Sequence, residues 1–181
     1  PGALREGAAD VRGQEGRLIR VLGIDPGTRV AGYGVVDAEG TRLGFVACGV
    51  LRAPRQAPVE RRLAALAKGL REVLEAWRPD AVAMEDVFVK ADPRAALTVG
   101  EGRGALLAVF GERELAVTSY PPAKVKRAVT GHGAADKLRV ARMVATLLGL
   151  EQPPEPPDAT DALAVALTHA LARKSQLLKG Q

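Results

Sequence analysis

Aromatic residues, cysteine and long apolar runs are all scarce in this chain. Aromatic residues make up 3% of the 181 residues, so its core must be built from aliphatic side chains. The single cysteine, Cys48, cannot form a disulfide within the chain, which argues against a disulfide-stapled secreted domain and favours the reducing cytoplasm. No stretch approaches the roughly 18 consecutive apolar residues of a membrane span, so we expect no membrane partner.

The chain does contain a globular share of apolar residues and an excess of basic ones. With 47% hydrophobic residues, it is most simply one folded domain. The net charge of +5 favours a polyanionic partner, although an ordinary basic surface would explain it equally well. The polar, glycine-rich residues 1–17 predict a loose tail without a signal peptide. We expect the domain to span 18–174 and a second tail to span 175–181.

Hydrophobic periodicity predicts a mixed α/β fold. Three strand-like runs come first, at 20–25, 30–37 and 43–51, with links so short that neighbours must be antiparallel. Two further short apolar runs follow, at 81–85 and 115–119, and between and after them lie helical patterns at 63–77, 93–110, 122–129, 135–148 and 158–173. This order indicates three antiparallel strands and then two parallel strands joined by crossovers, with helices flanking one sheet.

The helix expected from Pro93 is unusually rich in glycine. Gly100, Gly102 and Gly104 would each cost about 1 kcal/mol relative to alanine in a helix interior. Ala96, Gly100 and Gly104 recur every fourth residue and form a stripe of small residues. Close packing on the sheet and contact with a second subunit both explain such a stripe.

Four acidic residues stand at the ends of apolar elements. Asp25 ends the first strand, Glu85 ends the run 81–85, and Asp158 and Asp161 open the last helix. Taken singly, each has a structural explanation as a turn residue, a strand-end acid or a helix cap. Taken together they favour a site for Mg²⁺ or Mn²⁺, because hard divalent ions prefer carboxylate oxygens. Two such ions can activate water and stabilise the leaving oxygen of a phosphodiester.

Five blocks of the sequence resemble the RuvC family of crossover (Holliday) junction endodeoxyribonucleases. They are LGIDPGTRVAGYGVV, MEDVF, GEGRGALL, PAKVKRAVTGHGAADK and PPDATDALAVALTH, and they occur in the family's order from about residue 20 to 173. The resemblance implies a ribonuclease H-like fold and a homodimer that nicks a four-way DNA junction at paired positions. It also implies cooperation with a branch-migration helicase in recombination and repair.

The resemblance assigns the metal-binding and catalytic roles to the four acids. In the family, the residues that match Asp25, Glu85, Asp158 and Asp161 hold divalent metals. Our hypothesis is that two Mg²⁺ or Mn²⁺ ions bind in each active site, with Asp25 between them. Water would then be the nucleophile, and the products would carry 5′-phosphate and 3′-hydroxyl ends.

The resemblance also implies which residues contact DNA. Phe88 matches an aromatic that family members use against the junction bases, and a core or rim aromatic is the alternative. Lys126 and Lys137 match basic residues that contact DNA in the family. Arg139 and Arg142 extend that basic helix by inference alone.

Some features leave other functions open. The DPGT turn is also similar to the phosphate loop of actin-like ATPases and sugar kinases, but those proteins need a second such loop and a second domain. A catalytically silent junction-binding module and a related nuclease for other branched DNA or RNA are further alternatives. Asp86 replaces the family's usual amide, and residues 89–94 differ from its usual polar run, so the junction contacts and sequence preference stay open.

Overall fold

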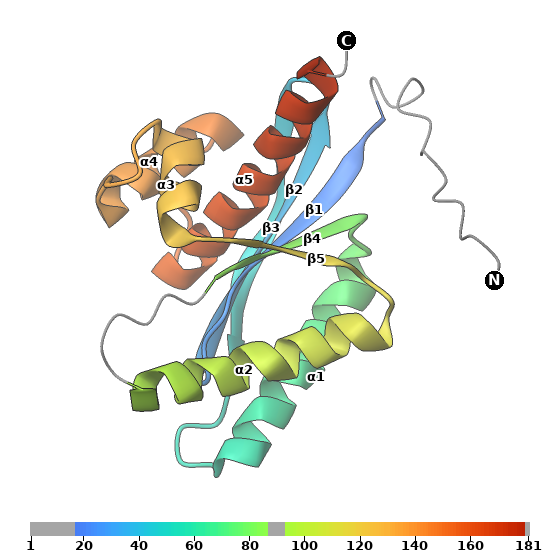
Figure 1. The fold of residues 1–181 in the computed structure, drawn as a ribbon, viewed down its shortest axis with the longest axis vertical. Helices are drawn as coiled ribbons and strands as arrows, with labels where there is room; N and C mark the ends of the chain where they lie inside the picture. Colours follow the sequence, from blue (N-terminus) through green and yellow to red (C-terminus); the bar gives the residue numbers. More distant parts are fainter. Residues whose placement is uncertain (1–16, 87–92, 180–181) are drawn as a thin grey trace, which may run out of the picture.

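The computed structural model describes residues 17–86 and 93–179, with side chains described over 17–86 and 96–173. In these residues the predicted alternation of strands and helices is confirmed (Figure 1). The strands are β1 (Ile19–Asp25), β2 (Val30–Glu39), β3 (Arg42–Arg52), β4 (Ala81–Glu85) and β5 (Val117–Tyr120). The helices are α1 (Val59–Trp77), α2 (Pro93–Glu112), α3 (Pro122–Thr130), α4 (Lys137–Leu148) and α5 (Pro157–Lys179).

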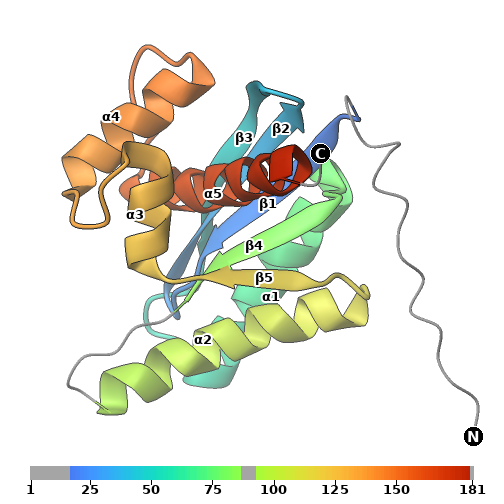
Figure 2. The same cartoon turned by 45° about the horizontal axis from the view of Figure 1, so that its top comes forward.

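The strands form one mixed sheet in the order β3-β2-β1-β4-β5. The pairs β1–β2 and β2–β3 are antiparallel, whereas β1–β4 and β4–β5 are parallel, as the sequence predicted. Helices α1 and α2 cover one face of the sheet, and α5 with α3 and α4 covers the other (Figures 1 and 2). No helix in the described ranges is long and apolar enough to cross a membrane.

Side-chain alternation along β1 divides the core into two layers. Ile19 and Val21 pack in the layer below α3, α4 and α5, while Leu22 and Ile24 pack in the layer of α1 and α2. Because side chains alternate between the faces of a strand, the residue that follows Ile24 belongs to the α5 face. That residue is Asp25, the first of the predicted site acids.

Helix α5 is longer than the sequence analysis predicted. We expected it to end near Lys174 and residues 175–181 to form a tail, but the helix continues to Lys179. The predicted end of the helix is therefore wrong, since residues 175–179 are helical, while the domain bounds stay a prediction. The segment contains no glycine or proline before Gly180, so nothing in its backbone chemistry ends the helix earlier.

The glycines of α2 divide into two groups. A Cβ on Gly102 would lie 2.7 Å from the carbonyl oxygen of Gly27, so this glycine lets α2 approach the turn after β1. Gly100 and Gly104, by contrast, have nothing within 4 Å of where a Cβ would be. Close packing on the turn after β1 thus explains Gly102, whereas close packing on the sheet is wrong for Gly100 and Gly104.

Candidate functional site

The ends of two parallel strands bring the first two acids together. The register pairs Ile24 of β1 with Met84 of β4, so Asp25 and Glu85 follow as neighbours at the same sheet edge. Ala81 and Ala83 lie in the layer of α5, and Val82 and Met84 lie in the other layer. The same alternation therefore places Glu85, like Asp25, on the face covered by α5.

Glycines on the sheet bring the other two acids to this edge. Gly32 of β2 is paired with Asp25, and a Cβ on Gly32 would lie only 1.9 Å from the carbonyl oxygen of Asp158. Gly23 on β1 likewise meets the backbone of Ala162. The start of α5 thus rests directly on the backbone of β1 and β2. Asp158 lies inside the first helical turn, since α5 begins at Pro157, so it does not occupy the N-cap position.

The acids share one electrostatic environment, and Asp25 is at its centre. Burial, followed by the negative charges of Glu85, Asp161 and Asp158, raises the pKa of Asp25 to about 7. The pKa of Glu85 is also raised, first by burial and then by Asp161. Carboxylates at such spacing resist ionising together, so the cluster is poised to take up a cation.

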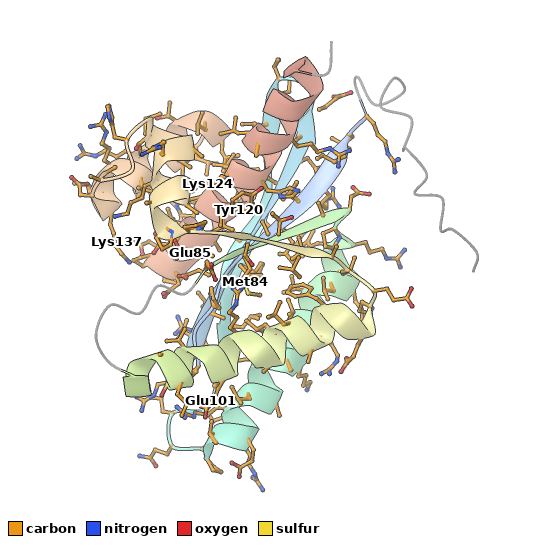
Figure 3. The ribbon with its side chains drawn as sticks, viewed as in Figure 1. Met84, Glu85, Glu101, Tyr120, Lys124 and Lys137 are labelled. Atoms are coloured by element: carbon orange, nitrogen blue, oxygen red, sulfur yellow. The ribbon has the colours of Figure 1, made fainter. Side chains whose placement is uncertain are left out.

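Two lysines supply the opposing positive charge in this structure. The positive charges of Lys137 and Lys126 both lower the pKa of Glu85 and so oppose the rise caused by burial. Both predicted basic residues therefore lie near the acids. The ammonium Nζ of Lys137 is 3.1 Å from Oδ2 of Asp161, and this hydrogen bond raises the pKa of Lys137. Figure 3 shows Lys137 and Glu85 reaching the same region from different elements.

A helix cap fixes where Lys137 begins its helix. The carboxylate of Asp136 accepts a hydrogen bond from the backbone N–H of Arg139 at 2.7 Å, which is the usual geometry of an N-cap aspartate. Lys137 is therefore the first residue of α4, at the end that faces the acids. The other two predicted basic residues, Arg139 and Arg142, lie exposed farther along α4, and Phe88 lies outside the described residues.

The donor atoms fit a hard divalent cation by chemistry, although in the described residues they do not surround one position. Among the described residues, no three histidine, cysteine, aspartate or glutamate side chains are close enough together to hold one ion. An all-carboxylate set is nevertheless what Mg²⁺ and Mn²⁺ prefer.

Arg103 is a site-associated residue that the sequence analysis did not single out. From α2, its guanidinium donates to the carbonyl oxygen of Glu85 at 2.9 Å and to the hydroxyl of Ser119 at 2.7 Å. It also lies 3.6 Å from the carboxylate of Asp86. The side chain is only 19% exposed, so it is held between β4 and β5 and fixes the backbone that carries Glu85. The sequence signal that could have identified Arg103 is its position among the glycines of a predicted helix.

Comparisons with known proteins agree with this geometry. The sequence model of one family, described as crossover junction endodeoxyribonuclease RuvC, matches residues 21–169. The chain is 43% identical over 162 residues to a protein of that name from Azorhizobium caulinodans, covering 90% of this chain and 95% of the relative. It is 45% identical over 153 residues to its namesake from Neisseria meningitidis, covering 84% of this chain and 85% of that one.

Solved structures give the same result. The structure of T. thermophilus RuvC in complex with Holliday junction substrate is 38% identical and superimposes with a TM-score of 0.81. The match covers 88% of this chain and 97% of that one. The sheet order, the helices on its two faces and the ribonuclease H-like architecture are therefore those expected from the resemblance. The chain belongs to the RuvC family of crossover junction endodeoxyribonucleases.

Proposed function

We propose that this protein resolves four-way DNA junctions by metal-dependent hydrolysis, with Asp25, Glu85, Asp158 and Asp161 as the residues that hold the metal. The observation that carries the proposal is the convergence of these acids, from two strand ends and one helix, on the α5 face of the sheet. Membership of the family carries divalent-metal dependence in general. The choice of Mg²⁺ or Mn²⁺ and the presence of two ions belong to the proposal.

The protein's own residues have distinct tasks in this mechanism. Asp25 and Glu85 present carboxylates from a rigid sheet edge, while Asp158 and Asp161 close the site from α5. Lys126 and Lys137 offset part of the acids' charge and lie where a phosphate could approach. A bound divalent ion would activate water and stabilise the leaving oxygen of the phosphodiester. We expect 5′-phosphate and 3′-hydroxyl ends.

The silent junction-binding alternative receives less support. It requires the acids to serve as caps and turn residues, yet Asp158 lies inside the first turn of α5. A structural role also gives no reason to hold Asp25 beside three other acids, where its charged form is disfavoured at neutral pH. A cation site explains both features.

Cleavage of a synthetic junction tests the proposal. We expect paired nicks in a labelled four-way junction with Mg²⁺ or Mn²⁺, and no nicks with chelator or in a linear duplex of the same sequence. Binding of the junction without cleavage in either metal would instead support the silent module. Cooperation with a branch-migration helicase remains a prediction of the resemblance, and a cytoplasmic location remains a prediction from the single cysteine.

We further propose that the protein acts as a homodimer through the stripe on α2. Gly100 and Gly104 have open space above them, and Leu97, one turn before Gly100, is 67% exposed. An exposed leucine beside small residues suits the close approach of a second copy. A two-fold dimer also matches a two-fold substrate, since each subunit would then cut one strand.

The Gly104→Leu variant is expected to weaken the dimer without weakening the subunit. In the isolated chain the added side chain meets open space, and leucine is the better helix former. Against a partner helix it would clash, so we expect the dimer dissociation constant to rise by about tenfold or more, a change of about 1.4 kcal/mol. Sedimentation velocity over a concentration series measures this, with the melting temperature as the check on folding. Unchanged association would place the interface elsewhere.

Replacing Arg103 should slow cleavage while sparing junction binding. In Arg103→Gln the carbonyl of Glu85 loses its guanidinium donor, and we expect cleavage to slow by roughly tenfold, as for other residues that orient metal ligands. Arg103→Lys should restore little, because an ammonium cannot bridge Glu85 and Ser119 as the guanidinium does. The matched control is Asp86→Asn, which keeps both contacts. Single-turnover rates measure the cleavage step, and dissociation constants in chelator measure junction binding. If binding weakened as much as the rate fell, Arg103 would be a DNA contact instead.

A further inference from the structure

A group of exposed arginines lies at the same sheet edge as the acids but belongs to other strands. Arg29 precedes β2, Arg52 ends β3, and Arg55 lies in the link to α1. The register pairs Val30 with Arg52, and the N–H of Ala53 donates to the carbonyl of Arg29 at 2.9 Å. We call Arg29, Arg52 and Arg55 the arginine edge, since their backbone segments are directly joined.

The side chains of the arginine edge lack protein partners. All three are exposed, and in the described part of the chain none of them has a hydrogen bond or an ion pair. Two other arginines show the contrast, since Arg20 binds Asp37 at 2.8 Å and Arg71 binds Glu112 at 2.9 Å. Like charges left together without acids repel one another, so the arginine edge would gain from a polyanion.

The position of the arginine edge relates it to the acids. β3 is two strands away from β1, or about 10 Å across the sheet, so the arginine edge lies beside the acids without being part of their cluster. Lys126 and Lys137 approach the acids from α3 and α4, whereas the arginine edge adjoins the link that enters α1 (Figure 1). The lysines and the arginine edge are therefore two basic groups that come from different elements.

We propose that the arginine edge is a second binding surface for DNA backbone phosphates, separate from that of α3 and α4. It holds a second stretch of the junction backbone, beside the ends of β2 and β3. Guanidinium groups suit this task because their planar donors bind phosphate oxygens in pairs. Such contacts position a substrate without reading its sequence. This inference rests on the proposed function, since it assigns the surface to the same DNA substrate.

Substitutions at the two ends of β3 provide the test. Arg52→Gln with Arg55→Gln removes two charges at the site edge, and the matched control, Arg42→Gln, removes one exposed charge at the opposite end of the same strand. Dissociation constants for a four-way junction are measured in chelator at several salt concentrations. We expect the double variant to bind roughly tenfold more weakly and its salt slope to fall by about 1.8, or 0.9 for each lost phosphate contact. Arg42→Gln should match the wild type, and Arg52→Lys should keep its slope.

The other outcomes overturn the inference, except the one that concerns cleavage alone. An unchanged slope in the double variant would mean that the arginine edge does not contact phosphates, as would an equal loss in Arg42→Gln. Weaker binding that follows a loss of dimer in sedimentation, with the slope unchanged, would assign the arginines to subunit association. A wild type that binds the junction but never cleaves it would refute the proposed nuclease while leaving the slopes to decide on the arginine edge. A wild type that binds no DNA would refute both.

Discussion

Replacing Asp25 by asparagine is expected to abolish metal-dependent cleavage of a four-way junction while leaving junction binding intact. The negative charges of all three other acids raise the pKa of Asp25, so Asp25 lies closest to the centre of the cluster. Asparagine keeps the size and one oxygen of the side chain but removes the charge that attracts a divalent ion. We expect the single-turnover rate to fall by a factor of about 10³ or more, as for other central catalytic groups.

The same substitution is expected to stabilise the protein in the absence of metal. The pKa of Asp25 is about 7 in the folded chain, well above the ordinary aspartate value of 3.8. The folded state therefore binds this proton more tightly than the unfolded state, and stability falls as pH rises from about 4 to about 7. The asparagine side chain carries no such charge, so the melting temperature in chelator should be higher for the variant at pH 7, and the difference should shrink toward pH 4.

Metal binding separates the two effects. Mg²⁺ or Mn²⁺ should raise the melting temperature of the wild type, because an ion that binds only the folded state stabilises it. The rise should be much smaller in Asp25→Asn. Glu39→Gln is the control, since Glu39 is exposed at the far end of β2 and should leave cleavage and metal response unchanged. A variant that cleaves normally, or that responds to metal like the wild type, would remove Asp25 from the site.

The strand pattern of the sequence was enough to predict which acids lie at this edge of the sheet. Short links require antiparallel neighbours, alternation assigns each side chain to a face, and an acid directly after a buried strand falls at the strand's end. Those rules place Asp25 and Glu85 correctly, provided that their strands are neighbours. The order of the strands is long-range information, and the sequence supported it through the length of the crossover and the family resemblance.

Other parts of the site depend on contacts that no local pattern encodes. Arg103 reaches Glu85 and Ser119 across two strands, so neither its spacing nor its neighbours reveal its partners. Similarly, the stripe of Gly100 and Gly104 suggested close packing in sequence, yet the α2 glycine that meets the turn after β1 is Gly102. Periodicity identifies which residues share a helix face, but it does not identify what that face meets.

Gly32→Ala is expected to damage both stability and catalysis, because Gly32 is where the sheet receives the start of α5. The added Cβ would lie 1.9 Å from the carbonyl oxygen of Asp158, and a helix backbone cannot turn aside as a flexible side chain can. Either α5 moves away from β2 or the strand distorts. We expect the free energy of unfolding to fall by about 1–3 kcal/mol or more, the usual cost of overpacking a core.

The effect on catalysis should exceed the effect on folding. A shift of α5 moves Asp158 and Asp161 together, since both lie in its first turns, while Asp25 and Glu85 stay with the sheet. Urea unfolding measures the stability, and the cleavage rate per folded molecule measures the site. Gly44→Ala on β3 is the matched control, because its nearest atoms would be 3.9 Å from the new Cβ. If Gly32→Ala unfolded and cleaved like that control, close contact between α5 and β2 could not be what brings the helix acids to Asp25.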